Sequence, residues 1–178
     1  IDIVAIAARP AATLGERAAA EVNDRTLAVL VSSVLFETAE IAGGLAKLAA
    51  RCRLHGAALL MDAYHHLNAV PFDLRALDLE DAFVTGGGYK YCQLGEGNCF
   101  LRVPPDTRLR PVLTGWFAEF ANLESGGGPP AGSHVAYAAG APAFAGATYD
   151  PTSHYRAAAV FDFHQEMALT PEYLRAIN

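Results

Sequence analysis

The chain is poor in charged residues, and the few that it has are not gathered by sign. Asp, Glu, Lys and Arg make up 18% of its 178 residues, the net charge is −6, and no segment concentrates Lys and Arg. A nucleic-acid or anionic-membrane partner is therefore disfavoured, because either one needs a basic surface. No apolar run approaches the ~20 residues of a membrane span, and no basic-then-apolar signal opens the chain. We expect a soluble, cytoplasmic protein.

Cysteine is also scarce, and its three residues are Cys52, Cys92 and Cys99. They contain no Cys-x-x-Cys pair and cannot all pair with one another, which favours a reducing compartment. Two histidines, His65 and His66, follow Asp62 closely. Neighbouring side chains point apart in most backbone conformations, and no further ligand has a suitable spacing, so we expect no zinc site.

Apolar residues are abundant, at 52% of the chain. The length allows one sizeable core, and plentiful Ala and Gly with few charges suit an α/β domain whose strands are buried on both faces. The chain opens at Ile1 without a methionine and stops at Asn178 inside a helical pattern. We therefore expect an internal fragment of a longer protein.

The hydrophobic pattern predicts a strand, a helix and a second strand in close succession. Residues 27–34 are a short apolar, β-branched run, residues 36–53 have apolar positions at helical spacing, and residues 57–62 form another apolar run entered through Gly56. Such a unit implies parallel pairing of the strands and a right-handed crossover.

The rest of the chain is less regular. We predict strands over residues 82–85 and 98–103, separated by a glycine-rich turn. Residues 125–132 (SGGGPPAG) and the Ala/Gly/Pro-rich stretch that follows are expected to lack regular structure. A helix is predicted over residues 152–167, capped by Thr152 or Ser153.

Asp62 ends the second predicted strand, at the edge of a parallel sheet where ligands bind. A carboxylate buried there would be costly without a cationic partner, and a protonated pyridine nitrogen is such a partner. A solvated acid that opens a loop fits Asp62 equally well when the residue is taken alone.

Lys90 stands 28 positions after Asp62, behind three glycines and between two tyrosines. Pyridoxal phosphate chemistry requires this pair: the lysine amine forms an imine with the cofactor aldehyde, while the acid keeps the pyridine nitrogen protonated. A partly desolvated pocket would favour the neutral amine. An exposed lysine in a tight turn is the alternative, and the spacing to Asp62 together with Tyr89 favours pyridoxal phosphate.

Several segments together resemble the class V aminotransferase-like branch of fold-type I pyridoxal phosphate enzymes, and within it kynureninase. They are Val31-Ser32-Ser33-Val34 with Thr38, Asp62-Ala-Tyr-His65, Tyr89-Lys90-Tyr91, Gly115-Trp116-Phe117 and Phe144-Ala-Gly-Ala-Thr148. The resemblance implies a three-layer α/β/α sandwich with a mainly parallel sheet. Residues 1–178 would be part of the large, cofactor-binding domain, without its N-terminal segment and without the C-terminal small domain.

The resemblance also implies roles for single residues. Lys90 would be the catalytic lysine, Asp62 would pair with the pyridine nitrogen, and His65 would lie close to the ring. Tyr89 and Ser32 would contact the phosphate region. Two further positions, Trp116 near the phosphate and Thr148 at the place of the family's asparagine or threonine, would belong to the neighbouring subunit's site in a homodimer with shared active sites.

The chain departs from the kynureninase pattern at three places. Ala39 follows Thr38 where the family usually has glycine, Cys92-Gln-Leu-Gly replaces an asparagine- and glycine-rich turn, and Thr148 replaces an asparagine. The resemblance nevertheless implies an enzyme that acts on an amino acid, by kynureninase-like hydrolytic cleavage of a Cβ–Cγ bond. A class V aminotransferase and an inactive fragment or dimerising scaffold are the alternatives. A cysteine desulfurase is disfavoured, because that group usually has glutamine where His65 stands.

Overall fold

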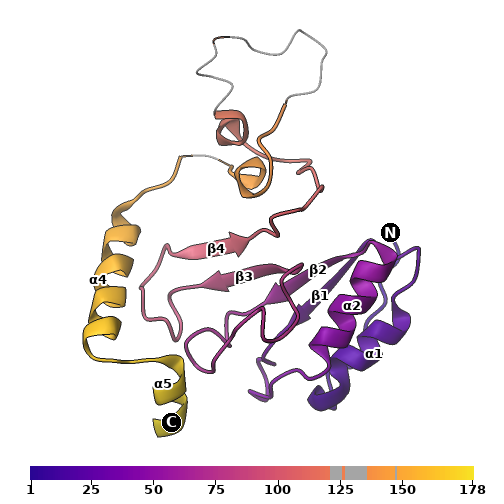
Figure 1. Cartoon of the computed structure of the whole chain (residues 1–178), viewed down its shortest axis with the longest axis horizontal. Coiled ribbons are helices and arrows are strands. Elements are labelled where there is room, and N and C mark those ends of the chain that lie inside the picture. The colour runs from indigo at the N-terminus through magenta and orange to yellow at the C-terminus, as the bar shows by residue number, and fades with distance from the viewer. Residues whose placement is uncertain (121–125, 127–135, 147) are drawn as a thin grey trace. The chain divides into compact units, whose positions relative to one another are not determined.

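The computed structural model describes residues 1–120, 126, 136–146 and 148–178. The chain forms two compact units: unit 1 comprises Ile1–Leu101 and Pro151–Asn178, and unit 2 comprises Arg102–Asp150 (Figure 1). The segment predicted to be irregular, residues 125–132, lies outside the described residues except for Gly126.

Unit 1 is built on a four-stranded sheet with the order β1-β2-β3-β4. Its strands are β1 (Ala28–Ser32), β2 (Ala58–Asp62), β3 (Phe83–Gly87) and β4 (Cys99–Arg102). The first three strands pair in parallel, and β4 runs in the opposite direction beside β3 (Figure 1). The predicted α/β class with a mainly parallel sheet is confirmed, and all four strands lie where the sequence predicts them.

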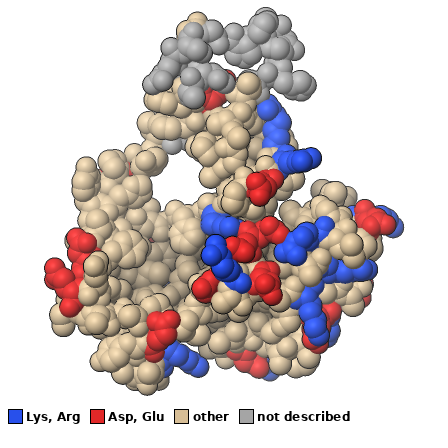
Figure 2. Space-filling view, viewed as in Figure 1, with Lys and Arg blue, Asp and Glu red and all other residues tan. Residues whose placement is uncertain are grey.

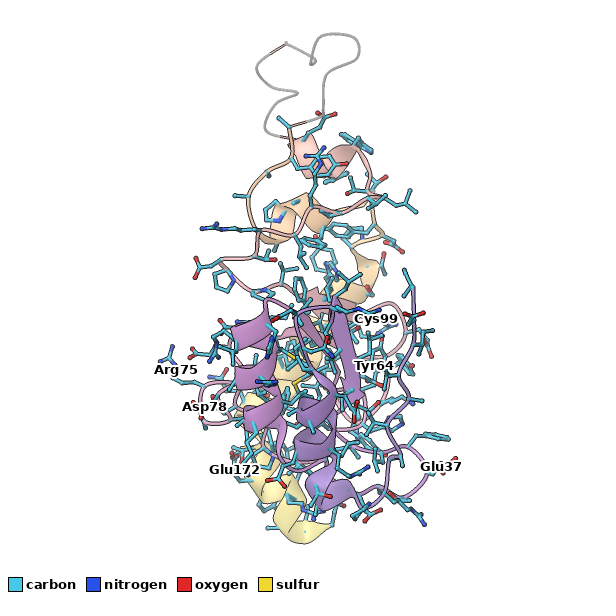
Figure 3. The ribbon with its side chains drawn as sticks, turned by 90° about the vertical axis from the view of Figure 1, so that its right-hand side faces the viewer. Glu37, Tyr64, Arg75, Asp78, Cys99 and Glu172 are labelled. Atoms are coloured by element: carbon cyan, nitrogen blue, oxygen red, sulfur yellow. The ribbon has the colours of Figure 1, made fainter. Side chains whose placement is uncertain are left out.

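Two helices, α1 (Leu14–Glu21) and α2 (Leu45–His55), lie side by side, and α2 packs on β2 (Figures 1 and 3). The core between the helices and the sheet contains Leu48, Met61 and Val84, each almost completely buried. Helix α1 was not predicted from the sequence. None of the described helices is long and apolar enough to cross a bilayer.

Helix α2 begins nine residues later than the predicted helix over residues 36–53. The chain after β1 first makes a hairpin-like turn, in which Val34 and Ile41 form an antiparallel bridge and the Leu35 amide donates to the Glu40 carbonyl at 2.9 Å. Gly44, with φ of 74°, then precedes the first helical residue. The prediction failed here because Ile41, which continues the helical spacing, is 45% exposed and outside the core.

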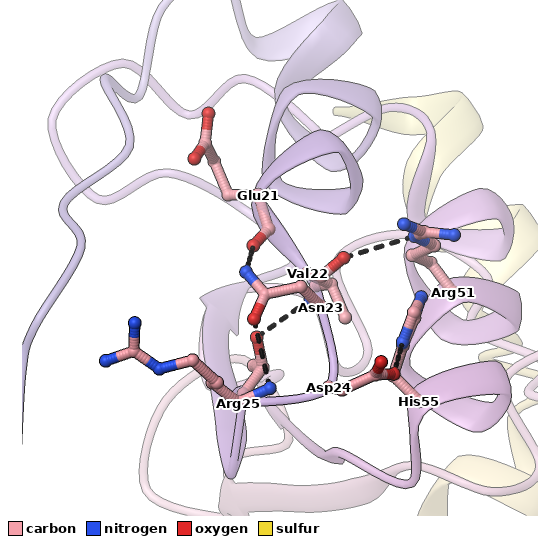
Figure 4. Close-up of polar contacts among 8 residues, drawn as sticks. Glu21, Val22, Asn23, Asp24, Arg25, Arg51 and His55 are labelled. Atoms are coloured by element: carbon pink, nitrogen blue, oxygen red, sulfur yellow. Dashed lines mark hydrogen bonds and ion pairs between the residues drawn. The ribbon is translucent and has the colours of Figure 1, made fainter.

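Polar contacts fix the connection between α1 and β1 to the end of α2 (Figure 4). The Arg51 guanidinium donates to the Val22 carbonyl at 3.2 Å, and His55 Nδ1 lies 2.6 Å from an Asp24 carboxylate oxygen. The entry to β1 is thereby held beside the helix that leads to β2.

The chain ends in α4 (Thr152–Glu166) and α5 (Pro171–Ile177), which belong to unit 1. Helix α4 confirms the helix predicted over residues 152–167, but the predicted cap is wrong: Pro151 occupies the N-cap position, and no side chain caps the helix. Helix α5 does have a side-chain cap, because the Thr170 hydroxyl accepts from the Tyr173 amide at 3.2 Å.

The described part of unit 2 includes the short 3-10 helices η2 (Trp116–Glu119) and η3 (Ala141–Phe144), which pack on each other. The Thr114 hydroxyl links them by hydrogen bonds to the carbonyls of Ala143 at 3.3 Å and Ala145 at 3.1 Å.

Candidate functional site

The site begins with a row of three polar residues across the parallel strands. Ser32 on β1 pairs in register with Asp62 on β2, and Asp62 pairs with Thr85 on β3. The preceding row contains Met61 and Val84, which belong to the core. Because successive side chains of a strand point to opposite faces, the polar row lies on the face turned away from that core.

The Asp62 carboxylate is fixed through both of its oxygens. Oδ2 accepts a hydrogen bond from the Ser32 hydroxyl at 3.1 Å, and Oδ1 accepts one from the Tyr64 amide at 2.9 Å. An oxygen of an ionised carboxylate has two lone-pair directions, so each can accept one further hydrogen bond. Asp62 is half-buried, and it is therefore held in one orientation with acceptor capacity left over.

Lys90 lies in the turn after β3, so it follows the carboxyl end of the strand next to Asp62. Its Nζ lies 5.3 Å from the centre of the Tyr89 ring, and within the described residues it forms no ion pair. The chain has one other lysine, Lys47, which is bound to Glu16 at the surface. Lys90 is thus the lysine whose ammonium is not already committed to a carboxylate.

Aromatic rings from three successive loops gather at the same sheet edge. The His65 ring lies 5.5 Å from Phe36 and 6.4 Å from Tyr91, measured between ring centres, and Tyr64 lies 5.8 Å from Tyr89. Phe36 is 80% exposed. The loops after β1, β2 and β3 therefore meet through flat side chains, and one of these, Tyr89, lies beside Lys90 Nζ.

Tyr64 is the most perturbed ionisable group of this region (Figure 3). Its pKa is raised to about 12, chiefly because its hydroxyl hydrogen-bonds to the Cys99 thiol and also because of burial and the neighbouring charges of Cys99 and Tyr89. A hydrogen bond with Thr85 acts in the opposite direction. Tyr64 therefore stays protonated at neutral pH and serves as a neutral hydrogen-bonding group.

The glycines before Lys90 are required for packing. A Cβ at Gly87 would lie 2.2 Å from the Tyr64 ring, and one at Gly86 would lie 2.5 Å from Leu67 Cδ1. Side chains of unit 1 therefore occupy the space in which a Cβ at either position would lie.

His66 differs from His65 in being 4% exposed, and its ring packs on Phe72 at 4.5 Å. Its Nδ1 has no hydrogen-bond partner among the described residues. Burial lowers the pKa of His66, against a smaller opposing effect of the Pro71 carbonyl. His66 is therefore a packed histidine of unit 1.

The two remaining candidates lie in unit 2. Trp116 is 49% exposed and packs on Phe117, with ring centres 4.5 Å apart, while Thr148 is exposed. Their roles at the site stay predictions. The sequence did not identify Thr85 as a residue of this site. It is the third residue of β3, and its alignment with Asp62 depends on the register between β2 and β3.

The charged side chains on one face of the described residues are not segregated by sign. On the face shown in Figure 2, acidic and basic side chains are intermingled. Such a surface gives no long-range attraction for a polyanion.

No protein-family model and no curated protein sequence matches the chain. Its structure is similar to the cysteine desulfurase CsdA from Escherichia coli, with a TM-score of 0.62 and 12% identity over 85% of this chain and 35% of that one. It is also similar to pyridoxamine-pyruvate aminotransferase from Mesorhizobium loti, with a TM-score of 0.50 and 14% identity over 91% and 39% of the two chains.

A third similar structure is serine palmitoyltransferase from S. paucimobilis with PLP bound, with a TM-score of 0.48 and 17% identity over 83% of this chain and 34% of that one. The chain thus spans about a third of the length of the proteins that it matches. It has the α/β fold, with a mainly parallel sheet, that forms part of the desulfurase and the aminotransferase.

Proposed function

We propose that the whole protein is a pyridoxal phosphate-dependent enzyme that acts on an amino acid. The observation that carries this proposal is the placement of Asp62 and Lys90 at the carboxyl ends of two adjacent parallel strands. Ligands of open α/β sheets bind at this edge. The shared fold of the desulfurase and the aminotransferase supports the same assignment.

The residues present fit the cofactor. Asp62 offers an oriented carboxylate with spare acceptor capacity for a protonated pyridine nitrogen. Lys90 offers an amine that is half-buried and has no ion-pair partner among the described residues. Tyr89 supplies a flat side chain beside Lys90, and His65 lies in the loop that follows Asp62. When bound, the cofactor supplies an electron sink for the pair released at the substrate's α-carbon.

The chain's own groups have distinct tasks in this proposal. Asp62 holds a proton on the ring nitrogen, and Ser32 keeps the carboxylate turned towards that nitrogen. Lys90 Nζ binds the cofactor aldehyde and carries the substrate's α-proton as a general base. The Tyr89 ring covers one side of that amine.

Two reactions are open to this set of residues. Kynureninase-like hydrolysis of a Cβ–Cγ bond is supported by the Asp62-Ala-Tyr-His65, Tyr89-Lys90-Tyr91 and Gly115-Trp116-Phe117 segments. Transamination to a keto acid is supported by the likeness in fold to an aminotransferase. Asp62 and Lys90 would serve both reactions in the same way.

The partial exposure of Trp116 and the exposure of Thr148 suit a homodimer in which these residues complete the neighbouring site.

The proposal is tested by absorbance titration of the full-length protein with pyridoxal phosphate. Wild type and Lys47→Ala should both develop the visible band of lysine-bound cofactor, whereas Lys90→Ala should not. Asp62→Asn should weaken binding about 10- to 100-fold, the range for losing a hydrogen bond to a charged group. Asp162→Asn, an exposed change on α4, is its control. Equal bands in wild type and Lys90→Ala would refute the assignment, and no band in wild type would favour a scaffold.

A further inference from the structure

The loop that carries Lys90 is closed by its own backbone. The Gly88 amide donates to the Asn98 carbonyl at 2.7 Å, and the Leu94 amide donates to the Gly88 carbonyl at 2.8 Å. Inside this closure, the Gln93 amide donates to the Lys90 carbonyl at 3.0 Å. The position of Lys90 therefore depends on where Leu94 and Asn98 are held.

Helix α4 holds both of these positions from more than 50 residues away in the sequence. Arg156 Nε donates to the Leu94 carbonyl at 2.7 Å, and its Nη2 donates to the Glu96 carbonyl. The Asn98 side-chain amide donates to the Ser153 carbonyl at 2.8 Å. The closing turn is thus fastened to the first two turns of α4.

The turn between these contacts is shaped around the guanidinium. Gly95 has φ of 71°, and a Cβ there would lie 2.6 Å from Arg156 Cζ. Within the described residues, Arg156 makes no ion pair with a carboxylate, and its hydrogen bonds go to main-chain carbonyls of this turn. A planar guanidinium can donate to two carbonyls at fixed geometry, which the single ammonium of a lysine cannot reproduce.

We propose that Arg156 is a positioning residue that fixes the Lys90 loop for reaction with the cofactor aldehyde. The effect of Arg156 on the reaction of Lys90 rests on the proposed function, whereas its effect on the position of the loop is argued from the contacts alone. An arginine committed in this way is also not available to bind a substrate carboxylate.

The test compares Arg156→Met and Arg156→Lys with Arg75→Met, which removes an arginine of an exposed ion pair with Glu80. Two quantities are measured in the full-length protein: hydrogen exchange at the Leu94 and Gln93 amides, and the rate at which borohydride-stable pyridoxal phosphate accumulates on Lys90. A merely structural role would lower the melting temperature and speed exchange throughout the sheet. It would not act on this loop selectively.

In Arg156→Met we expect faster exchange at Leu94, with Leu60 in β2 unchanged, and capture by Lys90 slowed about 10- to 100-fold, the range for a displaced reacting group. Arg156→Lys should recover part of both losses, and Arg75→Met should match wild type. Unchanged exchange at Leu94, or a loosened loop with an unchanged capture rate, would overturn the inference. If Arg156→Met does not fold, Arg156→Lys decides by the same two readouts. Failure of wild type to capture the cofactor would instead refute the proposed function, and exchange alone would then decide whether Arg156 holds the loop.

Discussion

The Ser32 hydroxyl donates a hydrogen bond to the Asp62 carboxylate, joining β1 to β2 across 3.1 Å. The two residues are exact partners in the parallel register, so the bond follows from the pairing of the strands. The family resemblance places Ser32 near the phosphate, and that role stays a prediction. The hydrogen bond favours a different role, in which Ser32 orients the acid that would meet the ring nitrogen.

Replacing Ser32 by alanine should weaken pyridoxal phosphate binding about tenfold, because one hydrogen bond to a charged group is lost. The melting temperature should change little, since Ser32 is only half-buried. Fluorescence titration measures the affinity. Ser33→Ala is the matched control: the buried Ser33 hydroxyl donates to the Asp62 carbonyl at 3.1 Å, away from the carboxylate. That change should cost about 1 kcal/mol of stability and leave affinity unchanged. Equal losses of affinity in both variants would contradict the orienting role.

Gly87→Ala should destabilise the protein by about 1–3 kcal/mol, because its Cβ would overlap the Tyr64 ring at 2.2 Å. Denaturant unfolding of the variant gives this value. Gly146→Ala, where a Cβ meets none of the described residues within 4 Å, should stay within about 0.5 kcal/mol of wild type. The cost of Gly87→Ala should shrink in a Tyr64→Ala background. A full cost in that background would show that Tyr64 is not the reason for the glycine.

Ala39→Gly should stabilise the protein by about 1 kcal/mol, since Ala39 has φ of 56°, a left-handed conformation that is unfavourable for a residue with a Cβ. This is one of the places where the chain departs from the family, which usually has glycine there. Thermal unfolding measures the gain. Ala50→Gly, on the exposed side of α2, should instead cost about 1 kcal/mol. A loss of stability in Ala39→Gly would show that the backbone relaxes around the alanine.

Stability should fall in mildly acidic solution because of His66. Its pKa in the folded protein lies below the ordinary value of 6.5, chiefly because burial disfavours the charged ring. The unfolded chain therefore takes up a proton first, and the stability due to neutral His66 is complete above about pH 6.5 and lost as the pH falls below it. His66→Phe should flatten the pH dependence between pH 7 and 5 in urea unfolding. An unchanged slope in that variant would assign the effect to other groups.

The strands could be predicted from the sequence because each is a short apolar run bounded by turn residues. The positions of Asp62 and Lys90 at the sheet edge could then be predicted as well, because Asp62 ends one of those runs and Lys90 follows the end of the next. The first half of the predicted helix over residues 36–53 was wrong, because the spacing of Ile41 matches the helix only by coincidence. The gathering of Phe36, His65 and Tyr91 could not be predicted, since it depends on how three loops meet. The same holds for Arg156, whose partners are carbonyl groups that no side-chain pattern reveals.

The most direct measurement of the central claim is borohydride reduction of the full-length protein with pyridoxal phosphate, followed by peptide mass mapping. If Lys90 is the cofactor-binding lysine, a stable adduct forms on Lys90, and Lys47 stays unmodified because it is paired with Glu16 at the surface. An adduct confined to Lys47 or spread equally over both lysines would contradict this role of Lys90, as would the absence of any adduct.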